Sequence, residues 1–540
     1  MHRVSPARRI AKATLFCVGF ISLATNLHAS AIYQYSVLEG DRRVYLWVPP
    51  ACRNVRGLIV AFKNLTEQRW LEDPIVRGAA GDECLGVVWI GAGRRSGLSA
   101  DMGSGAGDAF LVMQRDLAKV SGFPEIANAP IIPTGHSAQG QFAWKFAEWA
   151  PERTIAAIPI KTVPLPADLD LHGVPLLYIV GQTTEWPQYR DGRIGDRDYF
   201  WPVVRRNALA LRTADSYARI AVAVDPGGGH FDWSDSLARL LALYIHKACA
   251  GRLPPPSSAN SGPTPLRALS YQSGWLLDAA GMDTDRFRPA PIASYAGKSG
   301  GAYWVFDRET ADAIEQIQGD RVARKKQMLS FNQDGRTLPV AVQGFAALAL
   351  EPDSDGIIFH LDPTYLASVP TQLVNGGDAL GHADEPIHLG VITGPIAQTG
   401  PYTFALALSR ESGVDGWIEE EADQAAGYRK AVQPGKITLK GISTGQPQHI
   451  HFDQIAPHKM NRAPIVLHAS SDAGLPVHFY VVSGPARIDG DRLIITEFPR
   501  GGAPQIPVIL TAYQLGRVAS DTQSAVQQAD PVTQQFIITR

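Results

Sequence analysis

Residues 131–149 read IIPTGHSAQGQFAWKFAEW, and this stretch decides how the rest of the chain is interpreted. The apolar run 131–134 has the length of a buried strand, and apolar residues at helical spacing occupy 139–149. Ser137 lies on the turn between them. A serine on a tight strand-to-helix turn exposes its hydroxyl at the edge of a sheet, where the N-terminus of the helix favours negative charge. Ser137 is therefore a candidate nucleophile, with an ordinary helix-capping serine as the alternative.

The flanking sequence repeats this alternation of strands and helices. Further apolar runs of strand length lie at 57–62, 85–90, 155–160, 176–180 and 220–224. Helical spacing recurs at 108–120 and 235–247. Residues 32–38 and 43–48 flank Glu39-Gly40-Asp41 and predict a hairpin. The alternation predicts an α/β fold with a parallel sheet covered on both faces, so catalytic side chains should follow the carboxyl ends of strands.

A serine nucleophile needs a base, and the base needs an acid that fixes its tautomer. The glycine-rich loop after strand 220–224 carries His230, which is the expected base. The loop after strand 176–180 carries Glu185, the expected acid. The same loop offers three alternative acids: Asp191, Asp196 and Asp198. We interpret Asp225 as a loop or capping residue, and His136 as a packing residue that points away from the serine.

The turn Gly135-His136-Ser137-Ala138-Gln139-Gly140 resembles the nucleophile elbow of the α/β-hydrolase superfamily, G-x-S-x-G, except that Gln139 replaces the last glycine and Gly140 follows it. The order Ser137, Glu185, His230 also matches that superfamily. The resemblance covers roughly residues 32–250. It implies a serine hydrolase in which the three side chains form a catalytic triad.

The same resemblance implies an oxyanion hole built from two backbone N–H groups. Ala138, directly after the nucleophile, supplies the first. Similar secreted esterases and polyester depolymerases carry His-Gly near the second donor, where this chain has Lys63-Asn64. We carry the second donor over to Leu65, with Asn64 as the alternative.

Composition divides the remainder of the chain. Residues 251–265 are rich in Pro and Ser and predict a linker after a catalytic domain at 32–250. Residues 266–440 alternate short strands and turns, so we expect a β-rich accessory domain. Residues 441–540 have the strand spacing of a β-sandwich, and within them the stretch 474–486, GLPVHFYVVSGPA, resembles the immunoglobulin-like repeats of exported bacterial proteins. The expected order is thus an α/β-hydrolase parallel-sheet domain followed by β-rich accessory domains.

Residues 1–31 have the pattern of a signal peptide, because cations precede a short apolar run and small residues. We therefore expect a secreted or periplasmic protein. That compartment permits disulfides, and three cysteines remain outside the leader. We favour a bridge between Cys52 and Cys84 over any pair that includes Cys249.

Length and charge narrow the function classes. The chain has 540 residues, enough for two or three domains, and a formal net charge of −2 with no basic block beyond the leader, so we expect no nucleic-acid partner. No apolar run reaches the roughly 20 residues of a membrane span. We expect no cofactor and no metal, since Gly103-Ser104-Gly105-Ala106-Gly107 lacks the lysine of a phosphate loop and His449 and His451 lack a ligand cluster.

The expected function is a secreted serine hydrolase that cleaves carboxylic esters, either small molecules or esters borne on a polymer such as a plant polysaccharide. Two alternatives stay open: a binding or adhesion protein with a degenerate hydrolase domain, and a serine peptidase. No motif specifies the acyl group, the alcohol or the oligomeric state.

Overall fold

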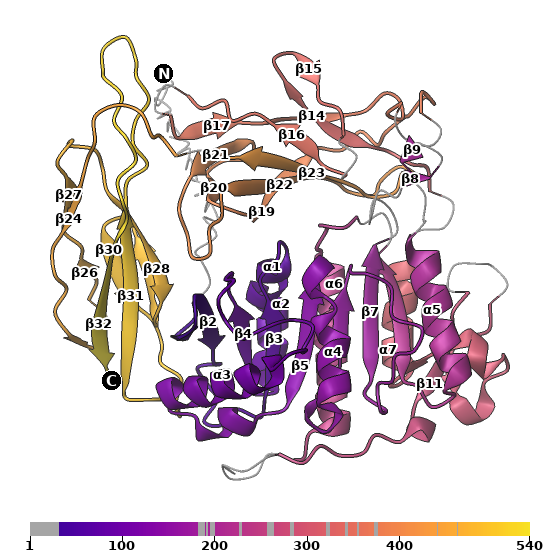
Figure 1. The fold of residues 1–540 in the computed structure, drawn as a ribbon. Coiled ribbons are helices and arrows are strands. Elements are labelled where there is room, and N and C mark those ends of the chain that lie inside the picture. The colour runs from indigo at the N-terminus through magenta and orange to yellow at the C-terminus, as the bar shows by residue number, and fades with distance from the viewer. Residues whose placement is uncertain are drawn as a thin grey trace, which may run out of the picture.

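The computed structural model describes residues 32–181, 189–190, 193–194, 200–225, 229–255, 264–280, 286–319, 324–340, 344–353, 356–371, 376–439, 441–461 and 463–540. Figure 1 shows a central sheet with helices, a β-rich part above it and a second β-rich part at one side.

An eight-stranded sheet forms the centre of the molecule, in the order β1-β2-β4-β3-β5-β6-β7-β10. Its strands are β1 (Tyr35–Glu39), β2 (Arg42–Trp47), β3 (Gly57–Phe62), β4 (Leu85–Ile90), β5 (Ile131–His136), β6 (Ile158–Ile160), β7 (Leu176–Gly181) and β10 (Ile220–Asp225). The predicted hairpin β1–β2 is antiparallel, and the six strands from β4 to β10 run parallel. Every residue of those six strands is buried, as expected for a sheet covered on both faces. This is the α/β-hydrolase arrangement that the sequence predicts.

Helices cover the two faces of this sheet, and the alternation of side chains along β3 shows how. Ile59 and Ala61 pack in one core with α2 and α6, whereas Leu58 and Val60 pack in another with α3. The helices are α1 (Glu67–Glu72), α2 (Pro74–Asp82), α3 (Ala106–Ser121), α4 (Phe142–Trp149), α5 (Phe200–Ala214) and α6 (Asp235–Arg252). No helix in the described part of the chain has both the length and the hydropathy to cross a membrane.

Residues beyond the predicted linker continue this core. The strands β11 (Trp275–Asp278), β12 (Ala290–Pro291) and β13 (Ala302–Val305) and the helix α7 (Arg308–Gly319) follow it. Leu277, Val305 and Ile314 are buried in the same cluster as Ala223 of β10 and Leu241 of α6. The core of the central sheet therefore extends past residue 250, while the domain boundaries stay predictions.

A β-rich domain, residues 324–439, lies over the carboxyl edge of the central sheet (Figure 1). It contains β14 (Leu329–Gln333), β15 (Arg336–Thr337), β16 (Ala346–Leu348), β17 (Ile358–His360), β18 (Asp362–Tyr365), β19 (His388–Thr393), β20 (Ile396–Gln398), β21 (Thr403–Leu406), β22 (Asp415–Ala422) and β23 (Ala431–Thr438). Its largest sheet has the order β16-β23-β22-β19. Phe331, Phe359, Phe404 and Ile418 form its own apolar core.

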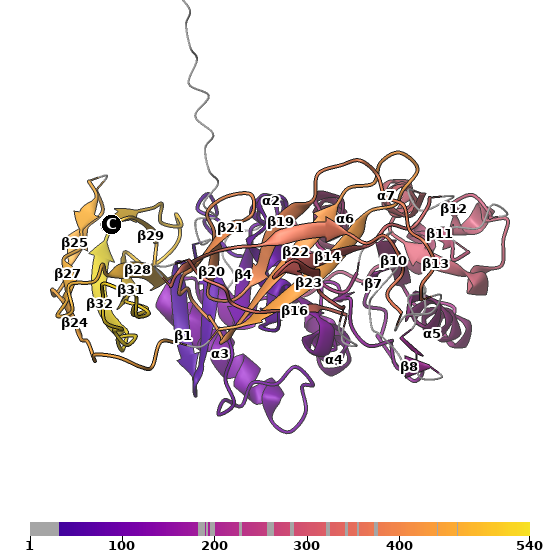
Figure 2. The same cartoon turned by 90° about the horizontal axis from the view of Figure 1, so that it is seen from above.

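The C-terminal part packs beside β1, as Figure 2 shows from above. Its strands are β24 (Ile450–Phe452), β25 (His458–Lys459), β26 (Ile465–Val466), β27 (Ala469–Ser471), β28 (His478–Ser483), β29 (Ala486–Asp489), β30 (Arg492–Ile495), β31 (Gln505–Tyr513) and β32 (Val532–Thr539). The Gly484 N–H donates to Tyr33 O at 2.8 Å, and the hydroxyls of Ser36 and Ser483 lie 2.8 Å apart. The architecture is strand-rich, while the immunoglobulin-like assignment stays a prediction.

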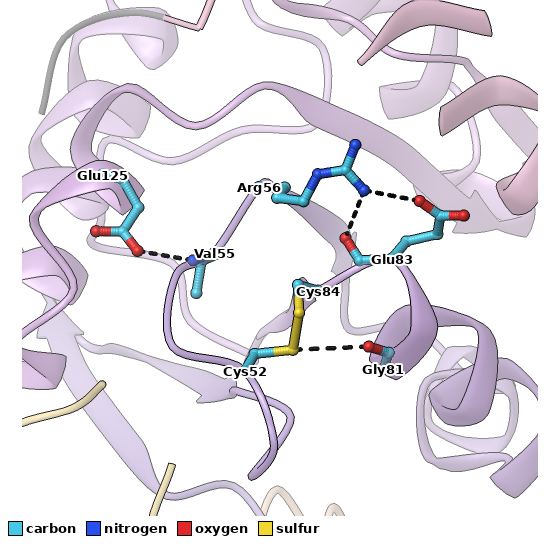
Figure 3. Close-up of a disulfide and its surroundings, with 7 residues drawn as sticks. All are labelled: Cys52, Val55, Arg56, Gly81, Glu83, Cys84 and Glu125. Carbon is cyan, nitrogen blue, oxygen red and sulfur yellow. Dashed lines mark hydrogen bonds and ion pairs between the residues drawn. A yellow bond between two sulfur atoms is a disulfide. The ribbon is translucent and has the colours of Figure 1, made fainter. Parts of the chain in front are cut away.

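A disulfide joins Cys52 and Cys84, with the two Cα atoms 5.7 Å apart, which confirms the predicted pairing (Figure 3). Arg56 and Glu83 form an ion pair next to it at 2.9 Å. Cys249 is a buried free thiol. The bridge fixes the loop before β3 to the start of β4.

Candidate active site

Ser137 lies directly after β5 in a strained conformation. Its φ is 54°, in the left-handed region that residues other than glycine seldom adopt. Two hydrogen bonds hold it there: the Ser137 N–H donates to Lys161 O at 3.2 Å, and Thr162 Oγ1 donates to Ser137 O at 2.5 Å. The hydroxyl of Tyr178 in turn donates to Thr162 O. The elbow is thus tied to the residues that follow β6.

Two glycines make this turn possible, and they explain why its sequence departs from the usual pattern. A Cβ at Gly135 would lie 2.5 Å from Gln139 O, and a Cβ at Gly140 would lie 2.4 Å from Thr162 Cβ. Gln139 itself is partly exposed. After Ser137, it is therefore position 140 that requires glycine, whereas position 139, the usual place of the second glycine, accepts a larger residue.

His230 lies in the loop between β10 and α6, and its side chain is buried. Its ring centroid is 4.5 Å from that of His136, the residue directly before Ser137. His136 Nε2 also lies 2.7 Å from His230 O. The structure therefore brings the predicted base against the nucleophile turn, although the two segments are far apart in sequence.

His136 does more than the packing role that the sequence suggests. A carbonyl oxygen only accepts, so His136 Nε2 carries a proton and donates to His230 O. Burial, together with the neighbouring His230 ring, lowers the pKa of His136 well below its ordinary value, so the ring stays neutral. His136 therefore positions the backbone of His230, the predicted base. Its place next to the nucleophile was the only sequence signal.

A buried lysine fixes both ends of the His230 loop. Lys161 Nζ lies 2.9 Å from Asp225 Oδ2 and donates to Asp232 O at 2.6 Å. Burial raises the pKa of Asp225 to about 7 despite this pairing. Burial also acts on Asp232, but the ammonium groups of Lys430 and Lys161 outweigh it and hold the pKa of that carboxyl below its ordinary value. Asp225 is thus engaged by Lys161, in keeping with a structural role.

The loop after β3 contains the two candidate donors Asn64 and Leu65. The Asn64 N–H donates to Glu67 Oε1, and Asn64 Nδ2 donates to His136 O at 3.1 Å. The Leu65 N–H, by contrast, donates to none of the residues that the structure describes. Burial raises the pKa of Glu67 to about 7. These bonds leave Leu65 as the better candidate, together with Ala138, which is exposed.

The predicted acid Glu185 lies outside the described residues, as do the alternatives Asp191, Asp196 and Asp198. The role of Glu185 therefore stays a prediction.

No protein-family model and no curated protein matches the sequence. Among solved structures, the chain is similar to an S-formylglutathione hydrolase from Staphylococcus aureus, with 13% identity over 38% of this chain and 92% of that chain and a TM-score of 0.28. It is similar to Est1E from Butyrivibrio proteoclasticus, with 13% identity over 40% and 100% and a TM-score of 0.28. It is also similar to poly(aspartic acid) hydrolase-1 from Sphingomonas sp. KT-1, with 16% identity over 37% and 94% and a TM-score of 0.26. The fold of the first part of the chain follows from the strand order of the central sheet and from the left-handed turn at Ser137.

Proposed function

We propose that the chain is a serine hydrolase that cleaves carboxylic esters. The observation that carries the proposal is the left-handed Ser137, held by hydrogen bonds at the end of β5, with the buried His230 packed against its neighbour His136. Strain of this kind persists only where surrounding contacts enforce it, and it is concentrated at active sites. A serine that merely capped a helix would need no left-handed backbone.

The proposed reaction follows from these positions. Ser137 Oγ attacks the carbonyl carbon of the ester while His230 accepts the hydroxyl proton. The N–H groups of Leu65 and Ala138 stabilise the oxyanion of the tetrahedral intermediate. His230 then passes the proton to the leaving alcohol, and water hydrolyses the acyl-enzyme by the same steps. Glu185 is proposed to orient the imidazole.

We further propose that the protein is exported and that its substrate is an ester borne on a polymer such as a polysaccharide. The leader pattern of residues 1–31 and the disulfide between Cys52 and Cys84 support export. The position of the β-rich domain over the carboxyl edge of the sheet supports a substrate that contacts more than one domain.

A fluorophosphonate probe tests the nucleophile, because it forms a covalent bond only with an activated serine. We expect labelling of the wild-type protein, mapped to Ser137 by mass spectrometry, and none in Ser137→Ala. No labelling of a folded wild-type protein would favour a binding protein without hydrolase activity.

A substrate panel then tests the reaction class. We expect turnover of acetyl, feruloyl or longer-chain aryl esters, and release of acid from an esterified polysaccharide. Faster turnover of peptides than of esters would instead indicate a peptidase.

A further inference from the structure

Strand β22 of the β-rich domain presents alternate side chains to the catalytic loops. Trp417, Glu419 and Glu421 share one face of the strand, because side chains two residues apart point the same way. Ile418, between them, is buried in the core of the β-rich domain itself. The outward face therefore carries one indole and two carboxylates.

The indole belongs to an apolar cluster that residues of both predicted catalytic loops share. The Trp417 ring centroid lies 5.1 Å from that of Phe231, which directly follows the predicted base. Leu65, the candidate oxyanion donor, packs against the same buried cluster of Phe231, Trp417 and Ile392. One apolar cluster thus joins the His230 loop, the oxyanion loop and the β-rich domain.

The first carboxylate reaches the same two loops through Arg69 of α1. Arg69 Nη2 lies 2.6 Å from Glu419 Oε1, and Arg69 Nη1 donates to Phe231 O at 3.4 Å. Glu419 is 3% exposed, so solvent screens this pair little. Helix α1 begins two residues after Leu65, so the guanidinium links the oxyanion loop to the residue next to the base.

The second carboxylate acts through Lys430, which lies just before β23. Lys430 Nζ lies 3.0 Å from Asp232 Oδ1 and 2.8 Å from Glu421 Oε1. The main-chain oxygen of Asp232 also accepts from Lys161, in the catalytic domain. Asp232, two residues after His230, is therefore held by one cation from each domain.

A separate contact docks the β-rich domain independently of this face. Tyr45 donates to Glu411 Oε1 at 2.9 Å, and the Ala92 N–H donates to Glu411 Oε2 at 2.8 Å. The guanidinium of Arg410 lies 5.1 Å from the ring centroid of Tyr33. A single substitution on β22 should thus leave the two domains joined.

We infer that the β22 face, which here means Trp417, Glu419 and Glu421 together with Lys430, is part of the active centre. Glu419 and Lys430 act as positioning residues and Trp417 as a packing anchor. Together they set the His230 loop against the oxyanion loop. The inference rests on the proposed function for its catalytic consequence. The β-rich domain then completes the catalytic site instead of serving only as a spacer or a polymer-binding module.

Lys430→Met tests this against Lys247→Met, a matched control. Lys247 also bridges two carboxylates, Asp307 at 2.5 Å and Glu309 at 2.6 Å. It lies 12 residues after Asp235, the first residue of α6, which is about 18 Å along the helix from the end that follows the His230 loop. We expect Lys430→Met to lower kcat and the rate of fluorophosphonate labelling by about 10- to 100-fold with little change in KM, since small misplacements of catalytic groups cost this much. Lys430→Arg, which keeps the cation, should recover most of the rate, and Lys247→Met should match wild type.

Glu419→Gln and Trp417→Ala supply independent variants should Lys430→Met fail to fold. Hydrogen–deuterium exchange adds a readout that needs no activity: peptides covering 229–234 and 63–69 should exchange faster in the β22-face variants and unchanged in Lys247→Met. Unchanged rates and unchanged exchange in all three folded variants would overturn the inference. If the wild-type protein resists the probe but exchange rises as expected, the proposed function fails while the coupling of β22 to both loops stands.

Discussion

His136 and His230 lie with their ring centroids 4.5 Å apart, and His136 Nε2 donates to the main-chain oxygen of His230 at 2.7 Å. The residue before the candidate nucleophile Ser137 therefore fixes the backbone of His230, the predicted base, directly. Because burial lowers the pKa of His136, its ring should stay neutral, with the proton on Nε2, across the neutral range of pH.

His136→Phe should keep the ring packing and remove the donor. The unpaired carbonyl of His230 should lower the unfolding free energy by about 1–3 kcal/mol, and kcat should fall about tenfold with KM nearly constant, as expected for a displaced base. Steady-state kinetics and urea unfolding measure the two effects. His136→Gln retains an N–H donor and should recover part of the loss; equal rates in wild type and His136→Phe would contradict the assigned role.

Gly140→Ala should disrupt the elbow, because its Cβ would lie 2.4 Å from Thr162 Cβ. We expect a loss of about 1–3 kcal/mol in unfolding free energy and much slower fluorophosphonate labelling. Gly78→Ala is the control: this exposed position in α2 has open space around a Cβ, so the change should stabilise the protein by up to about 1 kcal/mol. Thermal unfolding checks both, and a harmless Gly140→Ala would show that the elbow tolerates a side chain.

Glu67 should make stability depend on pH. Burial raises its pKa from 4.5 to about 7 in the folded protein, so between these values the native state binds more protons than the unfolded state. The unfolding free energy should therefore fall as the pH rises through this window, by up to about 3 kcal/mol. Glu67→Gln still accepts from the Asn64 N–H but cannot ionise, so its unfolding free energy should fall less steeply with pH; the raised pKa of Asp225 accounts for the part of the slope that stays. The same slope in both proteins would exclude Glu67 as the source.

Lys161→Met should be strongly destabilising, by about 3–5 kcal/mol, because it leaves the buried Asp225 carboxylate without its cation. The double variant Lys161→Met with Asp225→Leu should be less destabilised than the single variant, since no buried charge then lacks a partner. A double-mutant cycle measured by chemical unfolding gives the coupling. Additive effects would mean that the two side chains do not act as a pair.

The disulfide should contribute about 3–4 kcal/mol, because it closes a loop with a sequence separation of 32 residues. Replacing Cys52 and Cys84 together by serine should lower the denaturation midpoint accordingly.

Cys249 should stay unmodified by a maleimide in the folded protein, because it is buried and burial raises the pKa of its thiol. Peptide mapping after labelling checks this, and rapid modification of Cys249 would contradict its burial.

Local sequence patterns predicted most of the central sheet and the turn at Ser137. Buried parallel strands are continuous apolar runs, so β3, β4, β7 and β10 were visible without any alignment. The helices α1, α2 and α5 were missed. Helix α1 has six residues, which is too short for a clear helical period.

The relationships that assemble the site have no local signal. Trp417 meets Phe231 and Lys430 meets Asp232 across almost 200 positions of sequence, and neither residue stands in a recognisable motif. The interpretation of His136 as a packing residue was incomplete for the same reason. Its partner is a main-chain oxygen, which no residue type reveals.

The continuous core of α6, β13 and α7 limits where the chain can be divided into fragments that fold. The proline-rich stretch after residue 250 is an obvious place to divide the chain, yet a fragment that ended there would lack Val305 and Ile314, which belong to the same apolar core as Leu241. The N-terminal fragment would expose apolar surface and tend to aggregate. Any exchange of modules between proteins of this type should therefore have its crossover beyond α7, and recombinant halves should be designed with that later junction.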